Sequence, residues 1–381
     1  MKKIPAILAL FLLLLSLSAL AENKAIRPSG SGSKEEPFLI SKIEHLVWMG
    51  ENITNVSAKC FRLAADIDAS ETKGWNDGRG FLPIGYMHEN KKAYASYPFR
   101  GCFDGGGHII SNLFINRKEQ GAALFARIGT PVQNFDFSTN VLENLAQRSK
   151  EFATIKDLAL VNCSFFGKDL AAGLSCNIDF AMISGVYISG SLKSEKLVAG
   201  FAGSCNNSCL DECGTNIEFK NRECNAAGCF STSQNTVLRN YLSLGSFQYS
   251  MDSPVDSRID SGYSARTIRK TGKSRDAYYS IRLISIGSFY LYNCLVLNSI
   301  STDRKKEKVI AFPNSTCVEN SYYSAENIKR TLSDNDEVGI SNEKLKRKDT
   351  YKDWDFDSVW EIEDGVSFPK LRKLEKMLKR L

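Results

Sequence analysis

A short pattern repeats along the sequence and restricts the possible folds more than any other feature. Each copy has an apolar residue, any residue, then Asn, Asp or Gly, followed by apolar residues in alternation. The six third positions are Asn112, Asp157, Gly185, Asn240, Asn293 and Asn320. They are separated by 45, 28, 55, 53 and 27 residues. Since two intervals are near 27 residues and two are near twice that, we predict one weakened copy inside each of the two longest intervals.

The repeat predicts an all-β solenoid. Short strands interrupted by Asn and Gly, at a period of about 20 to 50 residues, are typical of stacked coils. One coil cannot bury its apolar face alone, so neighbouring coils complete the core. A repeated Asn can also stack at turns, with each side-chain amide bonding the next coil. The alternative is an antiparallel sandwich with coincidental spacing, but the repeat includes turn residues, which favours the solenoid.

The first residues predict export. Lys2 and Lys3 precede an apolar run, and a small-residue A-L-A cleavage pattern ends at Ala21. This arrangement is typical of a signal peptide over 1–21, with the mature chain starting near Glu22. The alternative is an uncleaved anchor helix, although the apolar run is shorter than the ~20 residues of a bilayer span. No later segment has 18 uninterrupted apolar residues, so we expect a mature chain without a transmembrane span that is secreted, periplasmic or at the cell surface.

The charge distribution argues against nucleic-acid binding. The formal charge of the whole chain is +6, and removal of the two leader lysines leaves +4. Residues 370–381 contain six basic side chains and one Glu, so this tail carries +5 and the rest of the mature chain is close to −1. A nucleic-acid-binding surface needs Lys and Arg gathered on the folded body. We therefore expect no nucleic-acid partner.

Cysteine is abundant, with 11 residues in the chain. In an exported protein these are expected to form disulfides, and the odd count leaves at least one thiol unpaired within the chain. The densest group is Cys205, Cys209, Cys213, Cys224 and Cys229. We predict a disulfide-tied loop over 205–229; a zinc site is the alternative, but the spacing lacks the usual C-x2-C pair. No metal or other cofactor is predicted.

Several segments contain motifs that occur together in one bacterial family. Residues 30–41 read GSGSKEEPFLIS and 61–68 read FRLAADID. Residues 99–113 read FRGCFDGGGHIISNL, and 354–371 contain two Trp residues followed by a P-x-L sequence. These motifs resemble those of the GLUG-motif secreted and surface proteins. The resemblance covers most of the mature chain, from about residue 30 to 372.

The resemblance implies a right-handed parallel β-helix on a secreted or surface-displayed bacterial protein, with a role in adhesion or display. It implies coils with GLUG-like repeats over 59–369, after a leader and capping helix over 22–58 and before the tail at 370–381. The family's module also occurs beside the catalytic part of immunoglobulin-A-cleaving metalloproteases, but this chain has no H-E-x-x-H motif. Cys60 and Cys102 occupy like positions in two blocks of the resemblance. Stacked coils would place their Cα atoms about 4.8 Å apart, within reach of a disulfide.

Both ends of the mature chain are predicted to contain short helices. Ser41 and Glu44 form a capping-box pattern, and the apolar spacing after them predicts a helix over 42–51 that covers the first coil. The tail at 370–381 is amphipathic, with Leu371 and three further leucines at helical spacing. We predict that the tail docks over the last coil, where it would cover an unpaired strand edge. The alternative is peripheral attachment to an anionic membrane or cell-wall polymer.

The strongest candidates for catalysis are Asp104 and His108. Together with Asp66 and Asp68 they would form an acid–base or calcium-binding cluster, since glycosidases use paired carboxylates and Ca²⁺ takes oxygen ligands. We interpret the segment instead as a tight turn, because Asp-Gly sequences permit a positive φ. The turn residues are Asp104, Gly105, Gly106, Gly107 and His108. No residue is therefore assigned to catalysis.

The function predicted from the sequence is that of a non-enzymatic, adhesin-like binding or display protein at the cell surface. The expected partner is a surface polysaccharide or a protein, and the sequence does not identify the residues that bind it. The alternatives are a carbohydrate-active enzyme on the same scaffold, either a lyase or a glycosidase, and a structural component of the envelope.

Overall fold

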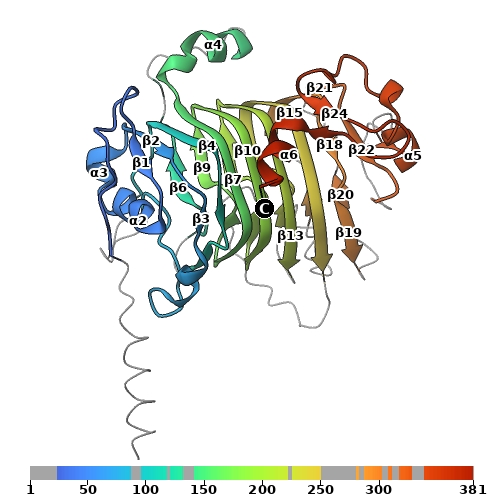
Figure 1. Ribbon diagram of the computed structural model, residues 1–381. Helices are drawn as coiled ribbons and strands as arrows, with labels where there is room; N and C mark the ends of the chain where they lie inside the picture. Colours follow the sequence, from blue (N-terminus) through green and yellow to red (C-terminus); the bar gives the residue numbers. More distant parts are fainter. Residues whose placement is uncertain are drawn as a thin grey trace, which may run out of the picture.

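The computed structural model shows a long stack of parallel strands with short helices at its periphery (Figure 1). The described residues are 24–86, 96–117, 121–130, 132, 141–221, 225–249, 280–282, 287–302, 308–310, 317–327 and 339–380. The predicted signal peptide at 1–21 and Cys224 lie outside them. No helix in this part of the chain is long and apolar enough to cross a bilayer.

The strands form three sheets. The largest contains β1 (Phe38–Ile40), β2 (Cys60–Leu63), β3 (Ile67–Asp68), β4 (Cys102–Ser111), β5 (Phe114–Arg117), β6 (Phe125–Ile128), β7 (Ala153–Gly167), β9 (Ser175–Asp179), β10 (Ala181–Ser194), β12 (Ala202–Asn206), β13 (Cys209–Asn221), β15 (Phe230–Tyr249), β17 (Gly287–Tyr292), β18 (Leu295–Val296), β19 (Ser299–Thr302), β21 (Cys317–Glu319), β22 (Tyr322–Ser324) and β23 (Gly339–Ile340). The second contains β8 (Ala171–Ala172), β11 (Leu197–Ala199), β14 (Asn225–Ala227), β16 (Ser280–Arg282) and β20 (Lys308–Ile310). The third contains β24 (Trp360–Glu361) and β25 (Lys370–Leu371).

Helices lie at the ends and along the sides of the stack. They are α2 (Ile43–Glu51), α3 (Ile53–Val56), α4 (Val141–Arg148), α5 (Asn342–Leu345) and α6 (Arg372–Leu378). Short 3-10 turns occur at η1 (Ser70–Gly74), η2 (Ser149–Glu151) and η4 (Lys348–Thr350).

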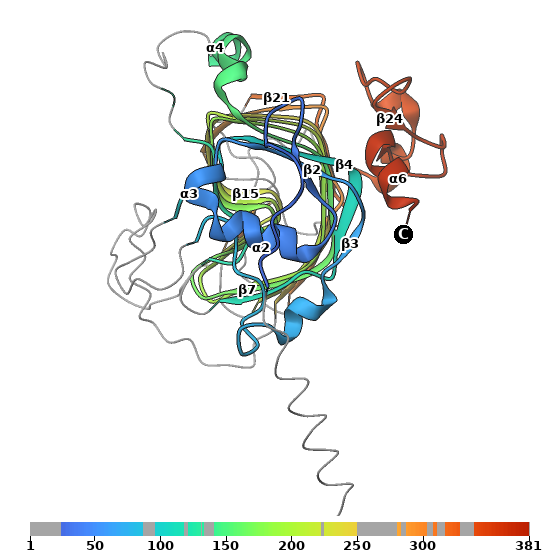
Figure 2. The ribbon, with the colours of Figure 1, turned by 60° about the vertical axis from the view of Figure 1, so that its left-hand side comes forward.

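The architecture is a parallel β-helix, as predicted. Strands β7, β10, β13 and β15 belong to successive coils and pair in parallel, so that Ile155, Ile183, Leu210 and Leu238 stack in register. These four side chains are buried inside the coils, which enclose the core (Figure 2). Burial of each side chain of this size stabilises the fold by about 1.5–3 kcal/mol. The stacked rows therefore hold the coils together, and the antiparallel-sandwich alternative is excluded.

One corner of the coils contains the repeated residue and has a left-handed backbone at each copy. The residues in register there are Asp157, Gly185, Glu212, Asn240, Asn293 and Asn320, with φ between 47° and 61°. Glu212 is the weakened copy predicted between Gly185 and Asn240. The prediction of a second weakened copy is wrong, because β15 pairs directly with β17 and places Asn240 beside Asn293.

Asn112, the first predicted copy, lies at a different corner of the coil. Its side chain donates to Asp68 Oδ1 at 2.9 Å and accepts from Asn162 Nδ2 at 2.6 Å. A third corner has the same kind of side-chain hydrogen bond between coils, where Asn207 donates to Asp179 Oδ1 at 3.0 Å. The predicted stacking of side-chain amides between coils is thus confirmed, but the interval of 45 residues compares two unlike corners.

The N-terminal end of the stack is closed by α2 and α3 (Figure 2). These helices connect β1 to β2, which pair in parallel, so the first coil begins at Phe38 and not at residue 59. The capping helix is confirmed, and its apolar face, including Leu46, is buried. The predicted capping box is wrong, since Lys42 is the N-cap and has no side-chain cap bond. Ser41 instead donates its backbone N–H to His45 Nδ1.

After β23 the chain leaves the coils and returns along the flank of the stack (Figures 1 and 2). This C-terminal segment, 341–380, packs over an outward-facing apolar row of the coils. The row is Ile109, Ala159, Tyr187, Gly214, Leu242 and Leu295. The predicted end of the coils at 369 and the predicted docking over the last coil are therefore wrong. The tail covers a lateral face because apolar side chains point outward there.

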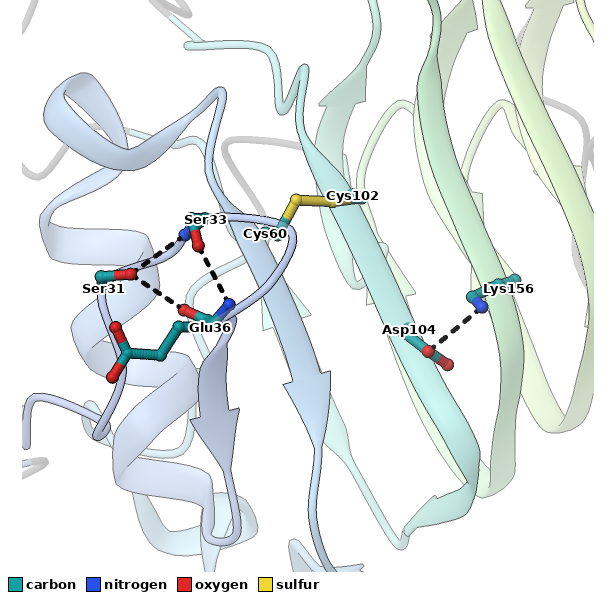
Figure 3. The surroundings of a disulfide bond; sticks show 7 residues. All are labelled: Ser31, Ser33, Glu36, Cys60, Cys102, Asp104 and Lys156. Carbon is teal, nitrogen blue, oxygen red and sulfur yellow. Dashed lines mark hydrogen bonds and ion pairs between the residues drawn. A yellow bond between two sulfur atoms is a disulfide. The ribbon is translucent and has the colours of Figure 1, made fainter. Parts of the chain in front are cut away.

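The cysteines take two different roles. Cys60 and Cys102 form the predicted disulfide, since β2 and β4 stack in register with these Cα atoms 4.5 Å apart (Figure 3). The predicted disulfide-tied loop at 205–229 is wrong, because the described residues there form regular strands, β12 to β14. Its free thiols are the buried Cys205, Cys213 and Cys229 and the half-buried Cys209. Alternation along the strands turns Cys205 and Cys213 into the core instead of toward a partner.

Candidate functional site

A groove lies on the flank of the stack, where α6 packs beside β4 and β7. Its volume is about 670 Å³. It is lined by Arg62, Asp104, Gly106, Gly107, Lys156, Asp157, Lys373, Lys376, Met377 and Arg380, and we name it the flank groove. One wall is the outward face of the first coils, and the other is the C-terminal helix.

The coil wall presents a row of alternating charges. Arg62, Asp104 and Lys156 are in register on β2, β4 and β7. Successive residues of a strand point to opposite faces, so burial of Phe103 and Ile155 in the core turns the next residue of each strand outward. Lys156 Nζ lies 3.2 Å from Asp104 Oδ2, and Figure 3 shows the two side chains facing one another across neighbouring strands.

The helix wall is held close to the coils by small residues beneath it. Leu374 and Met377 are 3% and 4% exposed, on the side of α6 that faces the coils. A Cβ atom on Gly214 would lie 3.0 Å from Leu374 Cδ1. A Cβ atom on Gly185 would lie 2.6 Å from Lys373 Cε. A larger residue at Gly214 would therefore press against Leu374, and one at Gly185 would displace the end of the Lys373 side chain from Asp157.

Polar contacts then fix the orientation of α6. Lys373 Nζ lies 2.6 Å from Asp157 Oδ1, which joins the helix to the repeated corner. Arg380 Nη1 donates to the Gly107 carbonyl at 2.8 Å, and its Nη2 lies 3.9 Å from Asp66 Oδ2. Lys373 lies in the first turn of α6 and Arg380 just beyond its C-cap, so the two contacts fix the angle of the helix on the coils.

Positive charge dominates the flank groove. Five of its lining residues are basic and two are acidic, which gives a net charge of +3. Both carboxylates, Asp104 and Asp157, are engaged by lysines. Arg62 and Lys376 form no ion pair with any other described residue, and both are exposed. The groove therefore has cationic groups available to an anionic ligand.

Lys373 and the neighbouring Glu212 both have pKa values raised above the ordinary ones. Burial lowers the pKa of Lys373, but the hydrogen bond and charge of Asp157 and the charge of Glu212 outweigh it and raise that pKa above the ordinary lysine value. Burial raises the pKa of Glu212, and the charge of Lys373 offsets only part of this increase. Lys373 is thus a cation at neutral pH and stabilises the docked helix.

The Asp104 segment forms a turn at the repeated corner. Between the register pairs on either side, Gly105, Gly106 and Gly107 stand opposite the single residue Asp157. Asp104 Oδ1 accepts from the Gly106 N–H at 2.8 Å, and φ is 59° at Gly106 and 73° at Gly107. A Cβ atom on Gly105 would lie 2.2 Å from the Asp157 carbonyl oxygen, so no side chain fits there. The Asp104 carboxylate thus has one oxygen bonded within the turn and the other paired with Lys156.

Asp66 and His108 form a pair at the rim of the groove, with His108 Nδ1 2.9 Å from Asp66 Oδ1. Burial raises the pKa of Asp66, but hydrogen bonds from His108 and the Ile109 N–H outweigh it and lower that pKa below the ordinary value. Asp68 accepts from Ser70 and contributes to a different corner. Among the described residues, no group of three or more His, Cys, Asp or Glu side chains is placed to hold a metal ion.

The residues that line the groove were only partly foreseen. Arg62 and Lys156 were missed, although the predicted Cys60–Cys102 pair sets a register that places Arg62 beside Asp104. Lys376 was recognised only as part of a basic tail. Its position on the flank could not be inferred, because the tail pattern does not indicate which surface it covers.

The fold and the groove define the class: a parallel β-helix with a basic groove on its flank. No protein-family model matches the chain. Over 176 residues it is 29% identical to Halomucin of Haloquadratum walsbyi, a match that covers 46% of this chain and 2% of Halomucin. One similar solved structure is a Bacteroides ovatus protein named as an immunoglobulin A1 protease candidate, at 12% identity and a TM-score of 0.45, covering 91% of this chain and 95% of that one.

Proposed function

We propose that this chain is an exported, adhesin-like protein that binds or displays at the cell surface without catalysing a reaction, and that its partner is a surface polysaccharide or a protein. The flank groove carries this proposal, since it offers charged groups on a rigid scaffold. A glycosidase needs one carboxyl group as general acid and a second as base or nucleophile. Both carboxylates of the groove are instead engaged by lysines.

Two further observations support an extracellular setting. The leader pattern at 1–21 is typical of export. Cys60 and Cys102 form a disulfide, and disulfides persist mainly in oxidising compartments. The resemblance to GLUG-motif surface proteins agrees with both.

The test combines localisation with binding. Cells expressing the full chain would be fractionated, and the exported form sequenced from its N-terminus, with a start near Glu22 expected. The mature protein would be tested on a glycan array and on surface-protein extracts, and each glycan hit assayed for new reducing ends or unsaturated products.

Retention in the surface or secreted fraction with binding and no product supports the proposal. Release of sugar products would replace it with the carbohydrate-active enzyme. Surface retention without any binding would favour a structural component of the envelope.

A further inference from the structure

We propose that the flank groove binds an acidic polysaccharide whose anionic groups are spaced along the chain, with Arg62 and Lys376 as the principal contacts. This inference rests on the proposed function and names its ligand class. The groove volume of about 670 Å³ lies within the range of about 300–1,000 Å³ that is usual for ligand sites. It therefore has room for a short stretch of an oligosaccharide.

The charge of the groove selects an anion. Its net charge is +3, and a cleft lined by one sign of charge concentrates counter-ions. Lys156 and Lys373 already face carboxylates, whereas Arg62 and Lys376 have none among the described residues. Arg62 can also hold a carboxylate or sulfate through two parallel N–H bonds.

The order of charges on the coil wall favours a polymer with anionic groups at intervals over a polymer with an anionic group on every unit. Arg62 and Lys156 lie two strand spacings apart, about 9.6 Å, with Asp104 between them in register. A polymer with an anionic group at every position would place one of them against Asp104 and be repelled. Lys156 keeps two of its three ammonium donors beyond its contact with Asp104, so a polysaccharide with a carboxylate on every second sugar can meet Arg62 and Lys156 while an uncharged sugar passes Asp104.

The test measures affinity for defined polymers with matched charge variants. The probes are hyaluronan oligosaccharides, which have a carboxylate on every second sugar, with polygalacturonate, polyphosphate and neutral dextran for comparison. The variants are Arg62→Gln, Lys376→Gln and the double variant. The control is Lys193→Gln with Lys352→Gln, which removes the same charge from exposed lysines that do not line the groove.

We expect hyaluronan to bind more tightly than the other probes, and increasingly weakly as salt screens the charges. Each groove variant should weaken binding about tenfold, as is usual for loss of a hydrogen bond to a charged group, and the control less than twofold. All variants should keep the wild-type melting temperature, since Arg62 and Lys376 make no ion pair in the described structure.

Three results would overturn the inference. They are equal binding by the groove variants and the wild type, polygalacturonate or polyphosphate binding as tight as hyaluronan, or no binding of any acidic polysaccharide. If the wild type still binds another glycan or a surface protein in those cases, the proposed function stands and only the ligand class fails. Loss of surface localisation would instead remove the proposed function itself.

Discussion

At the scale of single residues, the coils depend on left-handed backbone conformations at their corners. Asn and Asp tolerate a positive φ better than other residues with side chains, because their short polar groups can bond locally. Asn207 and Asn235 have φ of 49° and 51°, and their side chains link three coils, since Asn235 donates to Asn207 and Asn207 donates to Asp179. Glu212, with φ of 51°, departs from this rule at the corner beneath α6.

Replacement of Asn207 separates the two contributions of a corner residue. Asn207→Gly removes two hydrogen bonds but keeps the backbone free, so we expect a loss of about 2 kcal/mol in the free energy of unfolding. Asn207→Ala also places an alanine at positive φ, which adds about 1–2 kcal/mol. Denaturant unfolding of both variants checks this. Equal losses of unfolding free energy in the two variants would show that the positive φ contributes nothing to stability. A glycine variant as stable as the wild type would show that the two hydrogen bonds contribute nothing.

At the scale of elements, the C-terminal helix is stabilised by the surface that it covers. Seven residues are too few for a stable isolated helix in water. Leu374 and Met377 supply the apolar contacts of α6, while Lys373 and Arg380 supply the polar ones. The helix therefore forms one wall of the flank groove only while it is docked.

Truncation of one apolar contact should release α6. Leu374→Ala removes a side chain that is 3% exposed, and large-to-small changes at buried leucines cost about 2–5 kcal/mol. We expect faster proteolysis after residue 371, with the coils intact. Lys379→Ala, at the exposed C-cap that follows α6, is the control and should leave the rate of cleavage after residue 371 unchanged. Equal protection of both variants would contradict the docking of α6 through this face.

Docking of α6 should also weaken at alkaline pH. The folded pKa of Lys373 is raised above its ordinary value of 10.5, so the ion pair with Asp157 contributes fully below that value and is lost as pH rises through the raised pKa. Proteolysis of the tail should therefore be flat near neutrality and accelerate at high pH. In Lys373→Gln the tail should be more accessible at neutral pH and lose this pH dependence. A wild-type profile in that variant would exclude Lys373 as its cause.

At the scale of the whole molecule, most free thiols are enclosed by the stack. The structure has eight free cysteines among its described residues, of which Cys317 alone is exposed. Burial raises the pKa of Cys163 and Cys294 to about 12, and of Cys176 and Cys209 to about 11. Since the thiolate is the reactive form, these groups are inert at neutral pH even in an oxidising compartment.

Thiol labelling tests this arrangement. In the native protein at pH 7 we expect a thiol reagent to modify Cys317 rapidly and the six buried thiols not at all. In denaturant, the eight free cysteines of the described residues should all react, while Cys60 and Cys102 react only after reduction. Peptide mapping identifies the sites, and among the peptides of the described residues Cys317→Ser should remove the one rapid labelling site. Rapid native labelling of Cys205 or Cys213 would contradict their place in the core.

The sequence alone determined that the chain forms stacked coils and where their strands and left-handed corners fall. Apolar alternation with Asn, Asp or Gly at a fixed position specifies strands and left-handed corners, and both depend on neighbours in the chain. The register of Cys60 and Cys102 followed from two similar segments. Weakened copies such as Glu212 could be anticipated only from spacing, since their residue type is atypical for a left-handed corner.

Only the tertiary structure decided where each coil stands relative to the others and what covers the flank. Asn112 matched the repeat in sequence but lies at another corner, because the pairing of β4 with β7 places Ser111 beside Val161 and Asn112 beside Asn162, five residues beyond Asp157. The close spacing of the cysteines around Cys205 and Cys213 favoured a disulfide-tied loop, but both residues belong to strands, β12 and β13. The tail has an apolar face that would suit many surfaces. Its place, and with it the flank groove, was set by an outward apolar row that exists only after the coils stack.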